Sequence, residues 1–228
     1  MFGAVNALFS GLAFAILIVA PALQGAELKL QREELQHQRT ELRLQREEFE
    51  KQNQTLDAQR FENTFFQLLR MQADILAAIR FKNSGAISGR VVFSHLRSEL
   101  EFCYGQVKTY ASILDRVQQA YERMYSELEP HVGHYFRHLY HILKFVDDSD
   151  VADKRRCAKF VRAQLSSDEQ TILFYNCLST FGENFKPLAE KYALLQTMNQ
   201  EAVLDCKHLF LYEQSVYGDR RPVASPSS

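Results

Sequence analysis

The sequence has few residues that interrupt helices and few that cross-link a small domain. Nine of its 228 residues are glycine and five are proline, and long runs separate them. This scarcity predicts an all-α chain. No C-x-x-C pair is present among the four cysteines, which are Cys103, Cys157, Cys177 and Cys206. They are typical of buried free thiols in a reducing compartment, because a disulfide framework or zinc knuckle would space its cysteines more closely.

The sequence also lacks an excess of charge of either sign. The formal net charge is −1, so no global field recruits nucleic acid. The best local patch, Lys154-Arg155-Arg156 with Lys159 and Arg162, is short and is typical of a solvated helix face. No glycine-rich phosphate loop, HExxH or GxSxG motif is present, so we expect neither a nucleic-acid partner nor a cofactor.

Charge is missing altogether from residues 1–26, and residues 7–23 (ALFSGLAFAILIVAPAL) are almost entirely apolar. A membrane span needs about 20 such residues, so residues 1–26 are predicted to form a transmembrane anchor. The alternative is a cleaved signal peptide, because Ala20-Pro21-Ala22 offers small residues for cleavage. However, no lysine or arginine precedes the apolar run, as a signal peptide requires. The first cations follow it, which places the rest of the chain in the cytoplasm by the positive-inside tendency.

Residues 27–60 form a charged, glutamine-rich segment with a seven-residue repeat. The apolar repeat positions are Leu28, Leu35, Leu42, Phe49 and Leu56. LKLQREEL at 28–35 returns as LRLQREEF at 42–49. The pattern predicts a coiled coil, and hence a homo-oligomer. The second core position is polar, with glutamines if the leucines occupy position a and arginines if they occupy d. A single solvated helix held by Glu/Arg pairs four residues apart is the alternative.

Residues 61–217 are predicted to form a multi-helix bundle, followed by a disordered tail at 218–228. A helix over 61–79 ends at a loop containing Asn83-Ser84-Gly85. We then expect helices over 92–128, with an interruption near Gly105, and over 133–148, after a break at Pro130. Further helices are expected over 151–164, 187–198 and 199–217. Between the first two of these, a helix ending at 179 is expected to open on a capping box, either Ser166 with Glu169 or Ser167 with Gln170.

The central stretch, GHYFRHLYHILKFVDD at 133–148, carries the densest aromatic, histidine and arginine chemistry. Helical spacing gives it one apolar face and a flanking stripe of histidines. His134 and His138 are four residues apart, a spacing that can put two imidazoles on one metal, but no acidic or cysteine ligand accompanies them. We therefore expect half-buried histidines that bond to neighbouring helices and no metal site, with a metal pair as the alternative. Arg137 would pair with a carboxylate such as Asp147 or Glu183, or bind an anionic ligand.

Three strings carry a family resemblance: HYFRHLY at 134–140, QLSSDEQTILFYNCLS at 164–179 and FKPLAEKYALL at 185–195. From about residue 61 to residue 195, the chain resembles the phage abortive infection family, the AbiC-like proteins of bacteria. The resemblance implies a helical defence protein of the bacterial inner membrane, here single-pass. It supplies a biological role and almost no chemistry. Members often carry a further apolar segment before a string similar to FGAVNALFSGLAFA, so the chain has one span or represents a truncated two-span hairpin. The family motif residues here are His134, Tyr135, Phe136, Arg137 and Tyr140.

Three functions follow as hypotheses. The first is a non-enzymatic sensor and effector, in which a phage-derived or operon-encoded trigger changes the oligomeric or conformational state at the membrane. The second is a ribonuclease, because Arg90 and His95 (RVVFSH) have the spacing found in some helical defence ribonucleases. There His95 would act as general base and Arg90 would stabilise the phosphate charge. The third is a membrane-tethered scaffold without toxic activity.

Overall fold

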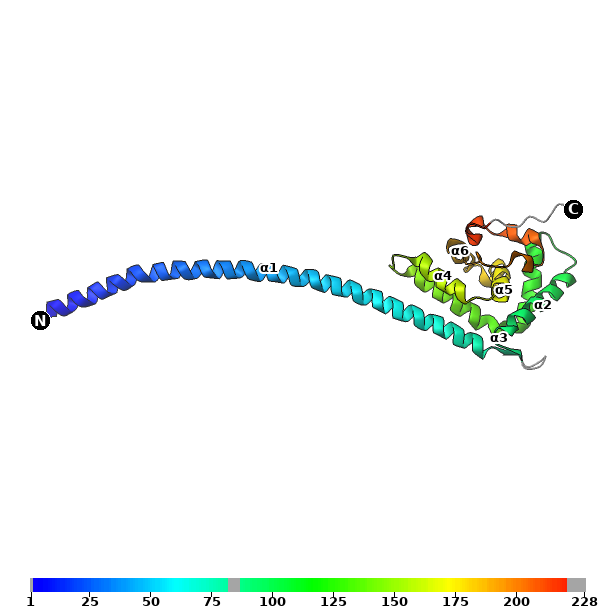
Figure 1. The fold of residues 1–228 in the computed structure, drawn as a ribbon, viewed down its shortest axis with the longest axis horizontal. Helices are drawn as coiled ribbons and strands as arrows, with labels where there is room; N and C mark the ends of the chain where they lie inside the picture. The colour runs from blue at the N-terminus through cyan, green and yellow to red at the C-terminus, as the bar shows by residue number, and fades with distance from the viewer. Residues whose placement is uncertain (1, 82–86, 221–228) are drawn as a thin grey trace. The chain divides into compact units, whose positions relative to one another are not determined.

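The computed structural model describes residues 2–81 and 87–220, and it divides into two compact units that meet between Gln59 and Arg60. These described residues are 81% helical with almost no strand, which confirms the all-α prediction. The predicted loop residues Asn83-Ser84-Gly85 and the tail residues 221–228 lie outside the described residues. Figure 1 shows the order of the elements along the chain.

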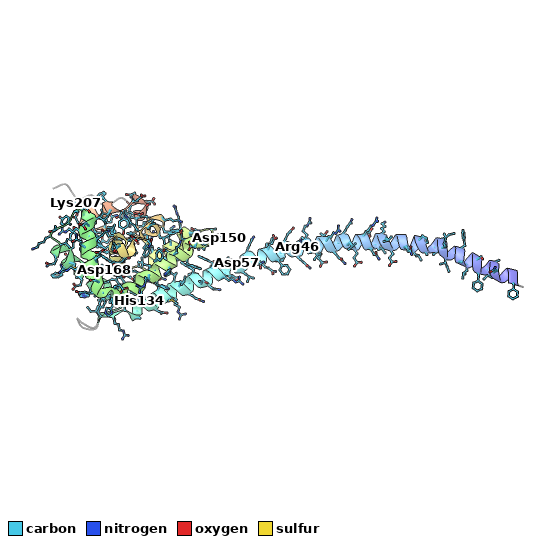
Figure 2. All side chains as sticks on the ribbon, turned by 180° about the vertical axis from the view of Figure 1, so that it is seen from behind. Arg46, Asp57, His134, Asp150, Asp168 and Lys207 are labelled. Carbon is cyan, nitrogen blue, oxygen red and sulfur yellow. The ribbon has the colours of Figure 1, made fainter. Side chains whose placement is uncertain are left out.

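The first helix, α1 (Phe2–Ala78), runs without interruption through the first unit and into the second. No glycine or proline occurs between Ala26 and Ala78, so nothing in the sequence ends the helix there. Among the described residues, α1 is the one helix long and apolar enough to cross a membrane, by length and composition alone. In Figure 2, side chains project from both edges of α1 near Arg46.

The second unit contains the end of α1 and all the remaining elements. A short hairpin follows α1. Its two strands have two residues each, and β1 (Arg80–Phe81) pairs antiparallel with β2 (Ile87–Ser88). The helices that follow are α2 (Val91–Gln106), α3 (Ile113–Asp148), α4 (Lys154–Gln164), α5 (Ser167–Leu178) and α6 (Lys186–Lys191). The 3-10 helices are η1 (Thr180–Gly182), η2 (Gln200–Ala202), η3 (Cys206–Leu211) and η4 (Gln214–Tyr217).

The predicted break at Pro130 is wrong, because α3 continues through this proline. A proline inside a helix costs about 3 kcal/mol. The buried stripe of α3 continues on both sides of it, from Tyr121 and Tyr125 to Val132 and Tyr135. Burial of these large side chains outweighs the local cost. The predicted interruption near Gly105 is correct, since α2 ends at Gln106 and the next helix starts after its cap at Ser112.

Three boundaries near the C-terminus also differ from the prediction. α4 begins at Lys154 rather than 151, because Asp153 caps it by accepting a bond from the Arg156 amide (2.8 Å). α6 ends at Lys191 rather than 198, and Ala193 just beyond has a left-handed backbone (φ 49°), which does not continue a helix. The predicted helix over 199–217 consists of three short 3-10 helices. Side-chain caps from Asn199 and Asp205 start new turns there and compete with a continuous helix.

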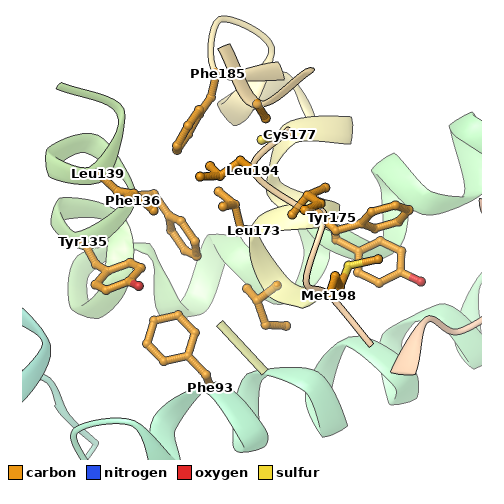
Figure 3. Close-up of a cluster of buried hydrophobic side chains, with 14 of the residues drawn as sticks. Phe93, Tyr135, Phe136, Leu139, Leu173, Tyr175, Cys177, Phe185, Leu194 and Met198 are labelled. Carbon is orange, nitrogen blue, oxygen red and sulfur yellow. The ribbon is translucent and has the colours of Figure 1, made fainter. Parts of the chain in front are cut away.

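The core of the second unit is built around α5. Ten consecutive α5 residues, from Glu169 to Leu178, are buried, which is typical of a helix covered on every side. Figure 3 shows Leu173 and Tyr175 of α5 among side chains from other elements, including Phe93 of α2 and Phe136 of α3. The capping box predicted for Ser166 and Glu169 opens this helix. Helix α5 therefore forms the centre against which the other helices are positioned.

Candidate functional site

A pocket of about 500 Å³ opens between α3 and the segment that joins α5 to α6. We call it the α3 pocket. Its α3 wall consists of Tyr125, Ser126, Glu129, Gly133, Phe136, Arg137 and Tyr140. Its other wall consists of Asn176, Phe181, Gly182, Asn184 and Phe185. Five of these side chains are aromatic, so the pocket combines ring surfaces with one carboxylate, one guanidinium and two amides.

One row of α3 supplies the charged part of the pocket. Tyr125, Glu129, Gly133 and Arg137 follow one another at four-residue intervals, so they lie along one ridge of the helix. Arg137 Nη1 donates to Glu129 Oε1 at 2.8 Å across the glycine between them. A Cβ atom at Gly133 would lie 2.7 Å from Glu129 Oε1 and 3.2 Å from Arg137 Nη1. The absence of a side chain at this position therefore lets the ion pair lie close to the helix.

The ion pair is open to solvent, with 65% of the Arg137 side chain and 40% of the Glu129 side chain exposed. Exposed pairs contribute between about 0 and 1 kcal/mol, so this contact adds little stability. The structure thus gives Arg137 a different partner from the predicted Asp147 or Glu183. Asp147 instead pairs with Lys191 and accepts a bond from the Tyr192 hydroxyl at 2.6 Å.

Tyr125 lies at the inner end of the pocket's charged row. Its ring centroid lies 4.6 Å from that of Phe181 in a tilted arrangement. Burial raises the pKa of Tyr125 to about 12; the Glu129 carboxylate adds to this rise and Arg137 opposes it. Its hydroxyl therefore stays protonated near neutral pH and can donate or accept a hydrogen bond. By contrast, Phe181 is 54% exposed and offers an open ring face.

Behind the α3 pocket, Tyr135 and His138 belong to a buried hydrogen-bond network. The Tyr135 hydroxyl donates to Glu169 Oε1 at 2.6 Å, and the Ser166 amide donates to Glu169 Oε2 at 2.8 Å. Gln72 of α1 donates to the Tyr135 carbonyl (3.4 Å), and its Oε1 lies 2.7 Å from His138 Nδ1. These bonds join α1, α3 and α5, so Tyr135 and His138 hold helices together and do not line the pocket.

The two histidines with the spacing of a metal pair lie in different environments. His134 is exposed, whereas His138 is half-buried, and burial, followed by the charge of His141, lowers the pKa of His138. Its Nε2 atom is buried and has no hydrogen-bond partner within the described chain. The described residues contain no group of three or more histidine, cysteine or acidic side chains placed to hold a metal ion. The metal pair stays an untested alternative.

The residues of the nuclease hypothesis lie outside the α3 pocket. Arg90 donates to the Gln164 carbonyl at 2.8 Å, and its Nε lies 3.8 Å from the buried Glu169 carboxylate. His95 packs edge-on against Phe81, with ring centroids 5.9 Å apart. Arg90 is thus held by protein groups that connect the start of α2 with α4 and α5. The catalytic hypothesis stays a prediction.

Three residues of the family motif, Phe136, Arg137 and Tyr140, line the pocket, and the other lining residues were not predicted as site residues. The four-residue spacing of Tyr125, Glu129, Gly133 and Arg137 was a usable signal for the α3 wall. The opposite wall gave no comparable signal, because Phe181 and its neighbours reach the pocket only through the turn after α5.

A family comparison bears directly on this site. Residues 127–203 match the family model described as "Putative phage abortive infection protein". The match confirms the resemblance carried by the three strings. It contains every residue lining the α3 pocket except Tyr125 and Ser126. No curated protein and no solved structure matches the chain.

Proposed function

We propose that this chain is an abortive infection protein anchored in the bacterial inner membrane, with its helical unit in the cytoplasm. The family match over residues 127–203 carries the proposal. The apolar, charge-free start of α1 supports the anchor, and the cations that first follow it support the orientation. In this proposal, the unit from Arg60 onward senses infection, and the membrane segment produces the effect on the host cell.

The α3 pocket is the part of the sensing unit best suited to receive a trigger. It is open, it lies almost entirely within the matched segment, and it offers Arg137 and Phe181 to solvent. Its groups suit binding more than catalysis. The Tyr125 hydroxyl is held protonated, and the Ser126 hydroxyl donates to the Arg123 carbonyl (3.0 Å). A phage-derived or operon-encoded molecule that displaces Glu129 from Arg137 would meet a small energetic cost.

The test compares three forms of the full chain in infected cells. One is unchanged, one has its apolar stretch replaced by an unrelated leucine-rich span, and one carries Leu12→Lys with Ile16→Lys. Each lysine at the centre of a span costs roughly 2.5–3.5 kcal/mol of insertion. Membrane fractionation, phage plating efficiency and a potential-sensitive dye are measured for each form.

We expect the lysine form to leave the membrane fraction and to lose protection. If the form with the unrelated span is found in the membrane fraction but gives neither protection nor depolarisation, the native span itself is the effector. Protection by the unrelated span without depolarisation would limit the span to anchoring and overturn its effector role. Full protection by a lysine form found in the soluble fraction would refute the membrane proposal.

A further inference from the structure

The first unit carries an apolar stripe that nothing in the described chain covers. Leu28, Leu35, Leu42, Phe49 and Leu56 have between 47% and 63% of their surface exposed. A glutamine follows each of them three residues later. With one preceding glutamine, the column consists of Gln24, Gln31, Gln38, Gln45, Gln52 and Gln59. Residues three and four apart share a helix face, so α1 presents a continuous seam of alternating leucine and glutamine.

Two heptad registers would place the leucines in a coiled-coil core, and charge distinguishes them. With leucine at position d, the core would also hold Arg32, Arg39 and Arg46. Each arginine would then face its own copy, and burying like charges together is strongly unfavourable. With leucine at position a, the glutamines occupy d and the arginines move to the flanking position e. The second register keeps every charge outside the core.

In that register the flanking positions complement a second copy of the same helix. Position g holds Glu27, Glu34 and Glu41, and position e holds Arg32, Arg39 and Arg46. In parallel helices, a residue at g meets the residue at e of the partner's next heptad, five positions later. Three g-to-e pairs join a glutamate to an arginine: 27 with 32, 34 with 39 and 41 with 46. The next pair, Glu48 with Asn53, carries a single charge. Antiparallel helices would instead bring glutamate to glutamate and arginine to arginine.

These charges are not satisfied within one chain. Residues five apart do not face each other on a single helix, and none of the six forms an ion pair within the described part of the chain. An ion pair that does form along this segment, Arg43 with Glu47 at 3.9 Å, lies on the outer positions b and f. The inward-flanking charges are therefore available to a partner.

The glutamine column favours the same arrangement. In a parallel, in-register pair, each glutamine lies beside its own copy. Its amide carries both donors and an acceptor, so two copies can bond to each other. In an antiparallel pair, each glutamine would lie beside leucine and lose these bonds. Polar core residues of this kind specify register and orientation at a cost in stability.

We propose that residues 24–59 associate with a second copy of this chain as a parallel, in-register coiled coil with alternating leucine and glutamine layers. This inference rests on the proposed function in one respect. Because half of the core is polar, the association depends on the membrane anchor to raise the local concentration of the stalks.

The first test is disulfide cross-linking of the full chain in native membranes. Single cysteines are introduced as Gln38→Cys at d, Arg39→Cys at e and Thr40→Cys at the outward position f. The unsubstituted chain measures the background from the native cysteines. Only the core position brings two Cα atoms within disulfide range, so we expect roughly tenfold more cross-linked product from Gln38→Cys than from Thr40→Cys. A higher yield from Arg39→Cys would overturn the proposed register, and equal yields at all three positions would overturn the coiled coil.

The second test exchanges the flanking charges in chains that carry Gln38→Cys. A basic form has Glu34→Arg with Glu41→Arg, and an acidic form has Arg39→Glu with Arg46→Glu. Each form repels itself in a parallel pair, whereas the two forms attract each other. We expect cross-linking to fall several-fold for each form alone and to recover as a mixed product on co-expression. Efficient cross-linking of either form with itself, or no mixed product, would overturn the parallel pairing.

Phage plating efficiency of the same strains separates this inference from the proposed function. Cross-linking as expected in cells that show no protection would refute the function and leave the coiled coil standing. Full protection by the basic form alone, without cross-linking, would refute the coiled coil as part of the defence mechanism and leave the membrane function standing.

Discussion

Replacing Tyr135 with phenylalanine separates the structural part of the family motif from its pocket. The Tyr135 hydroxyl lies 2.6 Å from the Glu169 carboxylate, which is 1% exposed. A hydrogen bond to a charged group contributes about 1.5–3 kcal/mol, and a buried acceptor left without its donor keeps its desolvation cost. Tyr135→Phe should therefore lower the free energy of unfolding of the second unit by about 2–3 kcal/mol.

Tyr140→Phe is the matched control, because it removes the same hydroxyl from the same motif. The Tyr140 hydroxyl makes no hydrogen bond within the described chain, so we expect a change below about 0.5 kcal/mol. Stability is measured in the full chain by maleimide labelling across a urea series. The Cys177 thiol, 1% exposed at the centre of the unit, reacts only when the unit opens. Equal stability of Tyr135→Phe and the parent, or equal losses for both variants, would refute the assigned role of Glu169.

The remaining predictions use the same assay. Gly182→Ala would place a Cβ atom 2.2 Å from the Asn176 carbonyl oxygen and should lower the free energy of unfolding by about 2–3 kcal/mol. Gly105→Ala, with open space around it, should raise it by up to about 1 kcal/mol. Equal changes in the two variants would contradict the close approach of Gly182 to Asn176. Burial lowers the pKa of His208 from its ordinary 6.5. Its neutral form therefore stabilises the fold fully above pH 6.5, and stability falls with pH below that value by up to about 1.4 kcal/mol per unit; His208→Gln should flatten this slope. Arg137→Ala should change the free energy of unfolding by less than about 1 kcal/mol and reduce phage protection. A decrease of more than about 2 kcal/mol would show that Arg137 mainly stabilises the fold.

Much of the fold could be predicted because its signals are local. The apolar stripe of α3, the Ser166 capping box and the absence of helix breakers in α1 each depend on residues close together in sequence. Pro130 shows the limit of such reasoning. Its local preference against a helix is real, but the burial of Tyr125 and Val132 on either side outweighs it. Part of that burial comes from Phe181, whose ring centroid lies 4.6 Å from that of Tyr125 and which is far along the chain.

The candidate site was only partly predictable for the same reason. Arg137 stood out by its aromatic neighbours, yet its predicted partners were Asp147, later on the same helix, and Glu183, beyond α5. The structure selects Glu129, two turns earlier on α3, because Gly133 leaves room between them. The opposite wall depends on how the chain turns after α5, and composition does not encode that turn. The heptads of α1, in contrast, can be followed in the sequence itself.

The burial of α5 has a mechanical consequence. At one end its Glu169 is fixed by Ser166 and Tyr135. At the other end Asn176 forms part of the α3 pocket and donates to the Tyr121 hydroxyl at 2.9 Å. Close-packed interiors resist compression and transmit strain. Strain introduced at Asn176 would therefore be transmitted through α5 to Glu169 and to the contacts that fix Arg90 at the start of α2.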